Sequence, residues 1–194
     1  VEHIAPKNLY PESAFLWENY LYACGPCNGP KNNKYAVRDI GGRLRNVTRA
    51  HGSPVSPPVA GSPLLINPRR EDPADFLELD LAGPYATFRY QPCLGLPRRA
   101  LARALWTRKV LGLNRPVITS ARRNVFDSYV ARLRTYASDK KGGCPPAELN
   151  RQRVSLLSKH FQSVFRQMQL QAAYVPGMRD LFQPIPEALA WTPP

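Results

Sequence analysis

The chain lacks any uninterrupted apolar run near the roughly 18 residues that a membrane-spanning helix requires. It opens at Val1 without the basic and then apolar segment of a secretory signal. Only four cysteines occur among 194 residues, and two of them form a close pair, which suits a metal knuckle better than a disulfide framework in a chain of this length. These absences predict a soluble, cytoplasmic protein that has no membrane partner and depends on an apolar core.

Acidic side chains are also scarce, because 14 Asp and Glu accompany 27 Lys and Arg, for a formal charge of +13. The excess lies in residues 98–194, with 17 basic and 5 acidic side chains, whereas residues 1–97 carry 10 and 9. Such a charge favours a polyanionic partner. Between positions 98 and 138 Asp127 is the only acid, which favours a phosphate-binding surface over ordinary wet helix faces that mix both signs. Few aromatic residues interleave with the basic ones, which favours the backbone of a duplex over stacked single strands.

Apolar residues form 43% of the chain, enough for a core in one domain or two small ones. Their spacing by three and four predicts helices at 13–23, 28–35, about 97–113, 118–136 and 149–168. Strict alternation over 76–81 and a Gly83-Pro84 turn before 85–90 predict a hairpin with one buried face. Residues 41–63, rich in Gly, Ser and Pro, are predicted to be a mobile surface loop.

Residue types that can carry chemistry gather in the first 31 positions. They are Glu2-His3, Asn19, Cys24-Gly25-Pro26-Cys27-Asn28 and Lys31. An imidazole can accept a proton from water at neutral pH. Carboxylate and amide oxygens are ligands that suit Mg²⁺ or Mn²⁺. The Cys-x-x-Cys spacing supplies half of a tetrahedral zinc site.

This order and spacing resembles the HNH endonucleases, whose core is a ββα-metal finger. Glu2-His3 matches the acid–His pair of that family, Asn19 the middle Asn, and Asn28 the last position, in an H-N-N variant. Lys31 matches a Lys three residues further on. Other segments resemble bacterial HNH proteins linked to retron and Septu-type anti-phage systems, namely 67–73, 113–115 and 186–191.

The resemblance implies a metal-dependent endonuclease that hydrolyses phosphodiester bonds in DNA, as a bacterial cytoplasmic protein of anti-phage defence. His3 is then the general base, Glu2 and Asn28 hold the catalytic Mg²⁺ or Mn²⁺, and Asn19 orients the His3 ring. The implied architecture is α+β, with a ββα-metal core and hairpin extension in residues 1–96. A mainly α-helical basic region follows in residues 97–194.

The resemblance also implies that Cys24 and Cys27 bind a structural Zn²⁺. The family carries a second Cys-x-x-Cys before the acid–His pair, so we expect the other half of this site to precede Val1. Cys93 and Cys144 stand alone beside Pro and Gly, and we interpret them as inert thiols.

Basic residues of both halves are predicted to contact nucleic acid, with double-stranded DNA favoured. They are Lys31, Arg98, Arg99, Arg103, Arg108, Lys109, Arg122 and Arg123. Two other functions remain open. In one, the chain is a non-catalytic zinc-knuckle module that binds nucleic acid, and Glu2, His3 and Asn28 are incidental. In the other, it is an effector subunit whose basic helices dock an ATPase partner of a defence complex.

Overall fold

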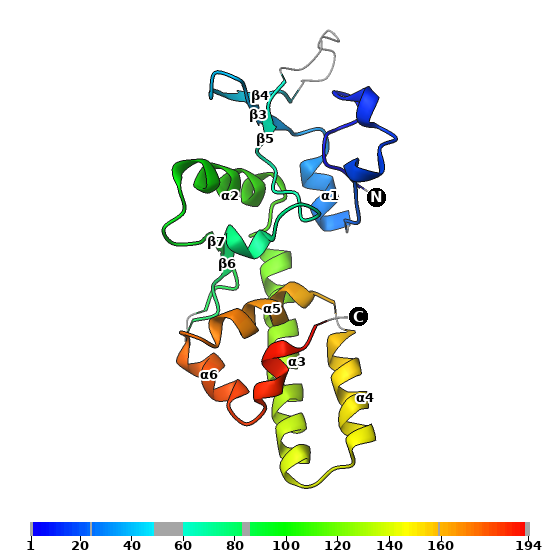
Figure 1. Cartoon of the computed structure of the whole chain (residues 1–194), viewed down its shortest axis with the longest axis vertical. Helices are drawn as coiled ribbons and strands as arrows, with labels where there is room; N and C mark the ends of the chain where they lie inside the picture. The colour runs from blue at the N-terminus through cyan, green and yellow to red at the C-terminus, as the bar shows by residue number, and fades with distance from the viewer. Residues whose placement is uncertain (1, 24, 49–59, 83–85, 159, 193–194) are drawn as a thin grey trace. The chain divides into compact units, whose positions relative to one another are not determined.

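The structure is a computed structural model that describes residues 2–23, 25–48, 60–82, 86–158 and 160–192, without the side chains of residues 26–28. It confirms the predicted α+β class, since small antiparallel sheets precede a mainly helical C-terminal half (Figure 1). The chain divides into two compact units. Unit 1 comprises residues 1–78 and 90–115, and unit 2 comprises residues 79–89 and 116–194.

Unit 1 begins with a strand, a second strand and a helix in that order. β1 (Glu2–His3) pairs antiparallel with β2 (Tyr20–Leu21), and His3 lies opposite Tyr20. Two short 3-10 helices, η1 (Pro11–Ser13) and η2 (Trp17–Asn19), occupy the connection between the strands. The helix α1 (Gly25–Lys31) follows β2. This order brings the end of β1 and the last turn of α1 within reach of one another.

The predicted helices at 13–23 and 28–35 are wrong in extent. Phe15 and Leu16 are both exposed, so the apolar spacing there did not mark a buried face. α1 instead starts at Gly25, inside the Cys-x-x-Cys segment, and ends before Asn32, whose φ of 42° lies in the left-handed region.

A three-stranded sheet follows in the order β4-β3-β5. The central strand β3 (Ala36–Arg38) is buried at Ala36 and Val37, and it pairs antiparallel with β4 (Leu44–Asn46) and β5 (Ser62–Pro63). The prediction of a mobile loop over 41–63 is therefore wrong for the two strands, and residues 49–59 lie outside the described part. Strand pairing depends here on Gly61, where a Cβ would lie 2.2 Å from the carbonyl oxygen of Arg38.

The alternating residues 76–81 contain one strand of the predicted hairpin, but the second strand begins later in the chain than predicted. β6 (Leu77–Leu79) pairs with β7 (Tyr90–Pro92), after the short helix η3 (Pro73–Asp75). Leu77, Leu79 and Leu81 are all buried, which confirms the single buried face. The return strand starts later than residue 85 because Phe88 adopts a φ of 55°, which interrupts extended backbone.

α2 (Arg98–Val110) closes the core of unit 1. Ala104 is fully buried against Ile66 and Leu77, whereas Leu101 and Leu105 are exposed, so only part of the predicted apolar stripe is correct. Two smaller clusters complete the core of this unit; they consist of Ile4, Leu65 and Val110, and of Leu9, Tyr35 and Val37.

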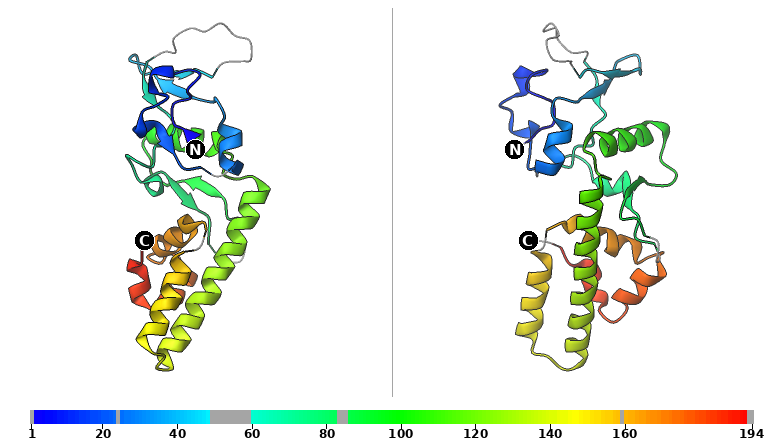
Figure 2. Two further views of the ribbon diagram at one scale, coloured as in Figure 1. Left: turned by 90° about the vertical axis from the view of Figure 1, so that its right-hand side faces the viewer. Right: turned by 180° about the vertical axis from the view of Figure 1, so that it is seen from behind.

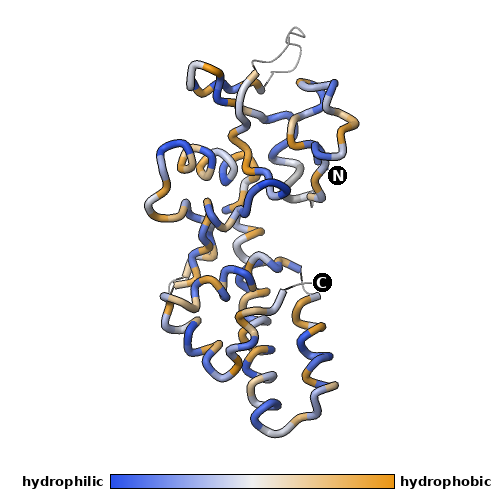
Figure 3. The backbone as a smooth tube through the Cα atoms, in the orientation of Figure 1, coloured by the Kyte–Doolittle hydropathy of each residue, from blue (hydrophilic) through white to orange (hydrophobic). Residues whose placement is uncertain are grey.

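Unit 2 is a helical bundle of α3 (Pro116–Lys141), α4 (Pro146–Leu157), α5 (Gln162–Gln171), α6 (Pro176–Phe182) and the 3-10 helix η4 (Pro186–Ala190). α3 and α4 run side by side (Figure 2). Hydrophobic and hydrophilic stretches alternate along both helices, as expected for helices with one buried side (Figure 3). Four members of the predicted α3 stripe are buried, namely Ile118, Tyr129, Leu133 and Tyr136, which confirms that helix.

The single helix predicted over 149–168 is two helices, α4 and α5. The break contains Phe161, whose φ of 57° is incompatible with a continuing α-helix. His160 consequently lies outside a helix and is exposed.

Two glutamines of α5 bind the main chain of β6 within unit 2. The Leu79 amide donates to Gln167 Oε1 at 3.1 Å, and Gln171 Nε2 donates to the Leu79 carbonyl at 2.5 Å. All three residues are buried. The side-chain amides therefore take the place of a neighbouring strand at this point.

Candidate active site and nucleic-acid interface

The ring of His3 is held at the end of β1 by contacts from the β1–β2 connection. Its Nε2 lies 3.1 Å from the carbonyl oxygen of Ala14, and the Tyr20 hydroxyl donates to the same oxygen at 2.7 Å. The His3 and Tyr20 rings also contact each other, with centroids 4.9 Å apart. A carbonyl oxygen has two lone pairs, so it can accept both hydrogen bonds.

This contact assigns the tautomer of neutral His3. A carbonyl can only accept, so Nε2 must carry the hydrogen and donate it to Ala14. In the neutral ring Nδ1 then keeps its lone pair. A half-buried imidazole arranged in this way can accept a proton at Nδ1 without losing the hydrogen bond that orients it.

Asn19 is buried and fixes the connection between the two strands. Its Oδ1 accepts from the Ala5 amide at 2.8 Å, and its Nδ2 donates to the carbonyls of Ala5 at 3.0 Å and Ser13 at 2.9 Å. The predicted hydrogen bond from Asn19 to the His3 ring is not among these contacts. Asn19 instead holds the segment whose Ala14 carbonyl orients the ring, so its effect on His3 passes through the backbone.

Lys31 and Glu2 join the last turn of α1 to β1. Lys31 Nζ donates to Glu2 Oε1 at 2.7 Å and to the His3 carbonyl at 2.6 Å. The lysine is 1% exposed. Burial lowers the pKa of Lys31, and the hydrogen bond that its ammonium group donates to Glu2 partly opposes that shift. The predicted contact of Lys31 with nucleic acid is therefore not supported, because its ammonium group is buried and already paired with Glu2.

The predicted metal ligands are only partly within the described residues. Both contacts of the Glu2 carboxylate, from Lys31 and from the His3 amide at 2.9 Å, fall on Oε1, so Oε2 faces no competing donor in this part of the structure. The side chains of Cys27 and Asn28 and all of Cys24 lie outside the description, so the zinc and magnesium sites stay predictions. The described side chains form no group of three His, Cys, Asp or Glu residues suited to a metal ion.

The basic residues of α2 that are predicted to contact nucleic acid fall into two groups, exposed side chains and side chains that bond other residues of the protein. Arg98, Arg99 and Lys109 are exposed, as a phosphate-binding surface requires. Arg103 Nη1 donates to Glu71 Oε2 at 2.7 Å, and its second terminal nitrogen bonds Oε1 of the same carboxylate. This pairing holds the pKa of Glu71 below its usual range. Arg108 donates to Gln91 Oε1 at 2.8 Å.

The two predicted contacts of α3 also differ. Arg122 is 3% exposed and donates to the Phe88 carbonyl at 3.2 Å. Its assignment to the nucleic-acid surface is wrong, because a buried guanidinium cannot reach a phosphate. Arg123 is exposed, although it lies over the Phe88 ring at 4.9 Å and donates to the Ala86 carbonyl at 3.2 Å. The run of arginines therefore has a structural part and a surface part.

Sequence reasoning missed three groups that shape the site. Ala14 contributes through its carbonyl, which has no signature in the sequence. Tyr20 directly follows Asn19, and it contacts the His3 ring and donates to the Ala14 carbonyl. Arg69 donates to the Trp17 carbonyl at 3.1 Å and lies 5.2 Å from the centroid of the Trp17 ring. These contacts join distant segments, so residue spacing alone could not indicate them.

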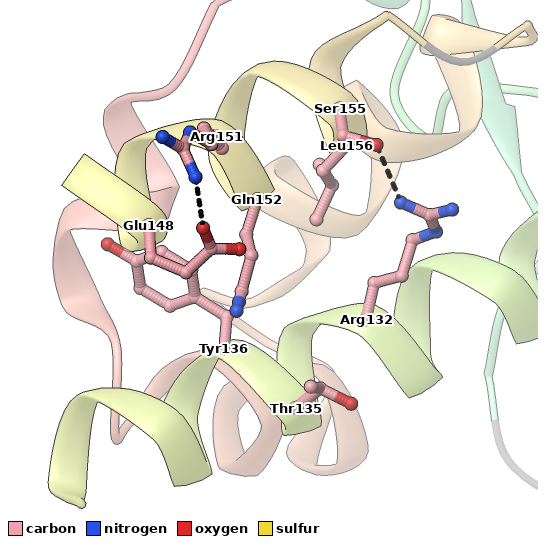
Figure 4. Close-up of a pocket in the computed structure, with 8 residues that line it drawn as sticks. All are labelled: Arg132, Thr135, Tyr136, Glu148, Arg151, Gln152, Ser155 and Leu156. Carbon is pink, nitrogen blue, oxygen red and sulfur yellow. Dashed lines mark hydrogen bonds and ion pairs between the residues drawn. The ribbon is translucent and has the colours of Figure 1, made fainter. Parts of the chain in front are cut away.

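Unit 2 contains a cavity of about 350 Å³ between α3 and α4 (Figure 4). Figure 4 shows Arg151 facing Glu148 and Arg132 facing Ser155. The first pair is an ion pair of 2.9 Å, and Arg132 donates to the Ser155 hydroxyl at 3.0 Å. Each of its two arginines therefore has a partner on the protein.

No protein-family model, curated protein or solved structure matches this chain. Within the described ranges, no helix is both long enough and apolar enough to cross a membrane.

Proposed function

We propose that this chain is a metal-dependent endonuclease of the HNH type that hydrolyses phosphodiester bonds in DNA, in bacterial anti-phage defence. The observation that carries the proposal is the orientation of His3, whose Nε2–H is committed to Ala14 while Nδ1 keeps its lone pair. The Glu2 carboxylate precedes this ring in the same strand, and the unit has the strand–strand–helix order of a ββα finger. A role in defence and an ATPase partner rest on the sequence resemblance alone.

In the proposed reaction His3 acts as the general base. Nδ1 removes a proton from a water molecule as the water oxygen bonds to phosphorus, and the bond from phosphorus to the 3′ oxygen breaks. The departing 3′ oxygen takes a proton from solvent, so the products carry a 5′ phosphate and a 3′ hydroxyl. Ala14 keeps the ring in place throughout, because Nε2–H donates to it in both the neutral and the protonated ring.

Two side chains are proposed to hold the divalent cation. Glu2 offers Oε2, because Lys31 and the His3 amide both use Oε1, and Asn28 in α1 would supply an amide oxygen. A divalent cation, when bound, polarises the phosphate and stabilises charge on the departing oxygen. Lys31 fixes the direction of the Glu2 carboxylate by holding its other oxygen.

The test of this proposal is nicking of supercoiled plasmid with Mg²⁺ or Mn²⁺ and with EDTA. Wild type should nick only with the metal, and His3→Ala should lower the rate at least about a hundredfold while duplex binding stays unchanged. The matched control is His160→Ala, which removes an exposed imidazole from unit 2. Equal nicking by His3→Ala and wild type would refute the role of His3.

One observation favours a non-catalytic nucleic-acid-binding module as the second candidate. The partly buried Glu2 carboxylate already forms an ion pair with the buried ammonium group of Lys31, and this pair can stabilise the fold without any metal ion. This candidate predicts duplex binding that is unaffected by EDTA and no nicking with either metal. The plasmid assay and a binding assay on one preparation therefore separate the two functions.

A further inference from the structure

Three arginines line one cavity of unit 1, a space of about 370 Å³. Arg38 comes from β3, whereas Arg99 and Arg103 lie one turn apart on α2. The rest of the lining is apolar except for Ser62 of β5, and it includes the Phe76 ring. No acidic side chain belongs to the lining that the structure describes.

The charges of this cavity are only partly compensated. Arg103 has the carboxylate of Glu71, which lies outside the lining. Among the described residues, Arg38 donates only to an uncharged group, the Gly42 carbonyl, at 2.5 Å. Arg99 forms no hydrogen bond or ion pair with a described residue. Three guanidinium groups therefore share one carboxylate, and the cavity carries an excess of about two positive charges.

Arg103 also carries one buried donor without an acceptor. Arg103 Nε has no hydrogen-bond partner among the described residues. Because this nitrogen is closed to solvent, a ligand in the cavity cannot reach it, and an anion there would be bound by the guanidinium groups of Arg38 and Arg99. Pro97 and Ala100 place the start of the 13-residue helix α2 at the same cavity, and a helix N-terminus favours an anion.

The cavity between α3 and α4 offers a contrast within the same chain. Its lining includes Glu148, which pairs with Arg151, so only Arg132 adds an excess charge there (Figure 4). The unit 1 cavity lacks such an internal carboxylate. An anion is therefore expected in unit 1 rather than between α3 and α4.

We propose that the cavity of Arg38, Arg99 and Arg103 binds one phosphate group of the DNA backbone. The assignment of the phosphate to DNA rests on the proposed nuclease function, whereas phosphate binding itself follows from the cavity. Planar guanidinium groups bind phosphate oxygens through paired hydrogen bonds, and the Ser62 hydroxyl can add a neutral one. The site lies in the same unit as His3, so a bound backbone would be anchored on the unit that is proposed to cleave it.

The experiment is titration calorimetry with inorganic phosphate at constant ionic strength, on the His3→Ala protein in EDTA. Arg99→Gln should raise the dissociation constant about tenfold, because it removes a charged donor that supports no contact of the fold. The control is Arg70→Gln, which removes the same charge from an exposed arginine of unit 1 outside the lining and should leave the value unchanged. Ser62→Ala tests the lining independently and should weaken binding about two- to threefold.

A short DNA duplex and a nucleoside monophosphate identify the source of the phosphate. We expect the duplex to displace inorganic phosphate, the monophosphate to bind no more tightly than phosphate, and Arg99→Gln to weaken the duplex more than Arg70→Gln does. Tight binding of the monophosphate would replace the DNA assignment with a free nucleotide. Equal effects of the two variants on inorganic phosphate, or no saturable binding, would overturn the cavity proposal. Because the assay uses no metal and a protein without His3, none of these results depends on nicking.

Discussion

Two buried polar side chains hold the candidate active site together in different ways. Asn19 is neutral, and its three hydrogen bonds replace main-chain contacts that the short ribbon cannot make. Lys31 is charged and depends on Glu2, because a buried ammonium group without an anion is unfavourable by several kcal/mol. The geometry of His3 therefore rests on one amide and one ion pair in its immediate surroundings.

The first prediction at this scale concerns Lys31→Met. Removing the ammonium group leaves Glu2 partly buried without its cation, with a side-chain exposure of 12%. The free energy of unfolding should fall by about 3 kcal/mol, measured by urea denaturation. Little of this decrease in the free energy of unfolding should come from lost packing, since methionine fills most of the volume of lysine.

Two further variants check that explanation. Lys34→Met removes an exposed ammonium group, bonded to the Pro30 carbonyl at 2.8 Å, and should cost less than about 1 kcal/mol. Glu2→Gln combined with Lys31→Met removes both charges and should recover part of the loss. A double variant as unstable as Lys31→Met would show that the ion pair is not the cause.

The sequence indicates which residues assemble at the site but not the contacts that they form. Glu2, His3, Asn19 and Lys31 were selected together, and the described structure does gather them around β1 and the end of α1. Asn19 bonds the backbone and not the ring, since its oxygen accepts from the Ala5 amide and its nitrogen donates to the carbonyls of Ala5 and Ser13. Contacts through main-chain atoms, such as the Ala14 carbonyl, leave no trace in residue spacing.

At the scale of elements, the spacing of apolar residues predicted the secondary structure correctly where an element buries one continuous face. The alternation of Leu77 and Leu79 and the stripe of α3 both correspond to buried positions. It failed where the apolar residues are exposed, as at Phe15 and Leu16. It also failed where a residue with positive φ, such as Phe161, interrupts a helix whose apolar spacing continues beyond the break.

An element-scale prediction concerns the two glutamines of α5. Gln171→Leu removes the donor to the buried Leu79 carbonyl and leaves that oxygen without its partner. The free energy of unfolding should fall by about 2 kcal/mol, the usual cost of an unsatisfied buried acceptor. Urea denaturation followed by circular dichroism measures the change.

The control for this prediction is Gln183→Leu, at an exposed position that follows α6. It makes the same chemical change and should alter stability by less than about 0.5 kcal/mol. Amide hydrogen exchange adds a local readout, because the Leu79 amide, bonded to Gln167, should exchange faster in Gln171→Leu. An unchanged exchange rate would mean that the glutamines do not support β6.

At the scale of the whole molecule, the side chains that give the net charge of +13 do not all belong to one binding surface. Some arginines serve the fold, as Arg122 does at the Phe88 carbonyl, and others are exposed. Charge counting along the sequence cannot separate the two groups, because both occur in the same helices. Burial does separate them, and it changes which residues are expected to control the binding of DNA.

The last prediction uses the salt dependence of duplex binding to distinguish these groups. For a charged surface that makes about six phosphate contacts, raising salt from about 50 to about 200 mM should weaken binding roughly a thousandfold. Arg99→Gln should reduce the slope of log affinity against log salt by about one, because one exposed cation is lost. Arg122→Gln should leave the slope unchanged and lower stability instead, since its guanidinium is buried at the Phe88 carbonyl. Filter binding in EDTA, with the His3→Ala protein as background, measures all three slopes. An equal decrease for Arg99→Gln and Arg122→Gln would contradict the division of the arginines by burial.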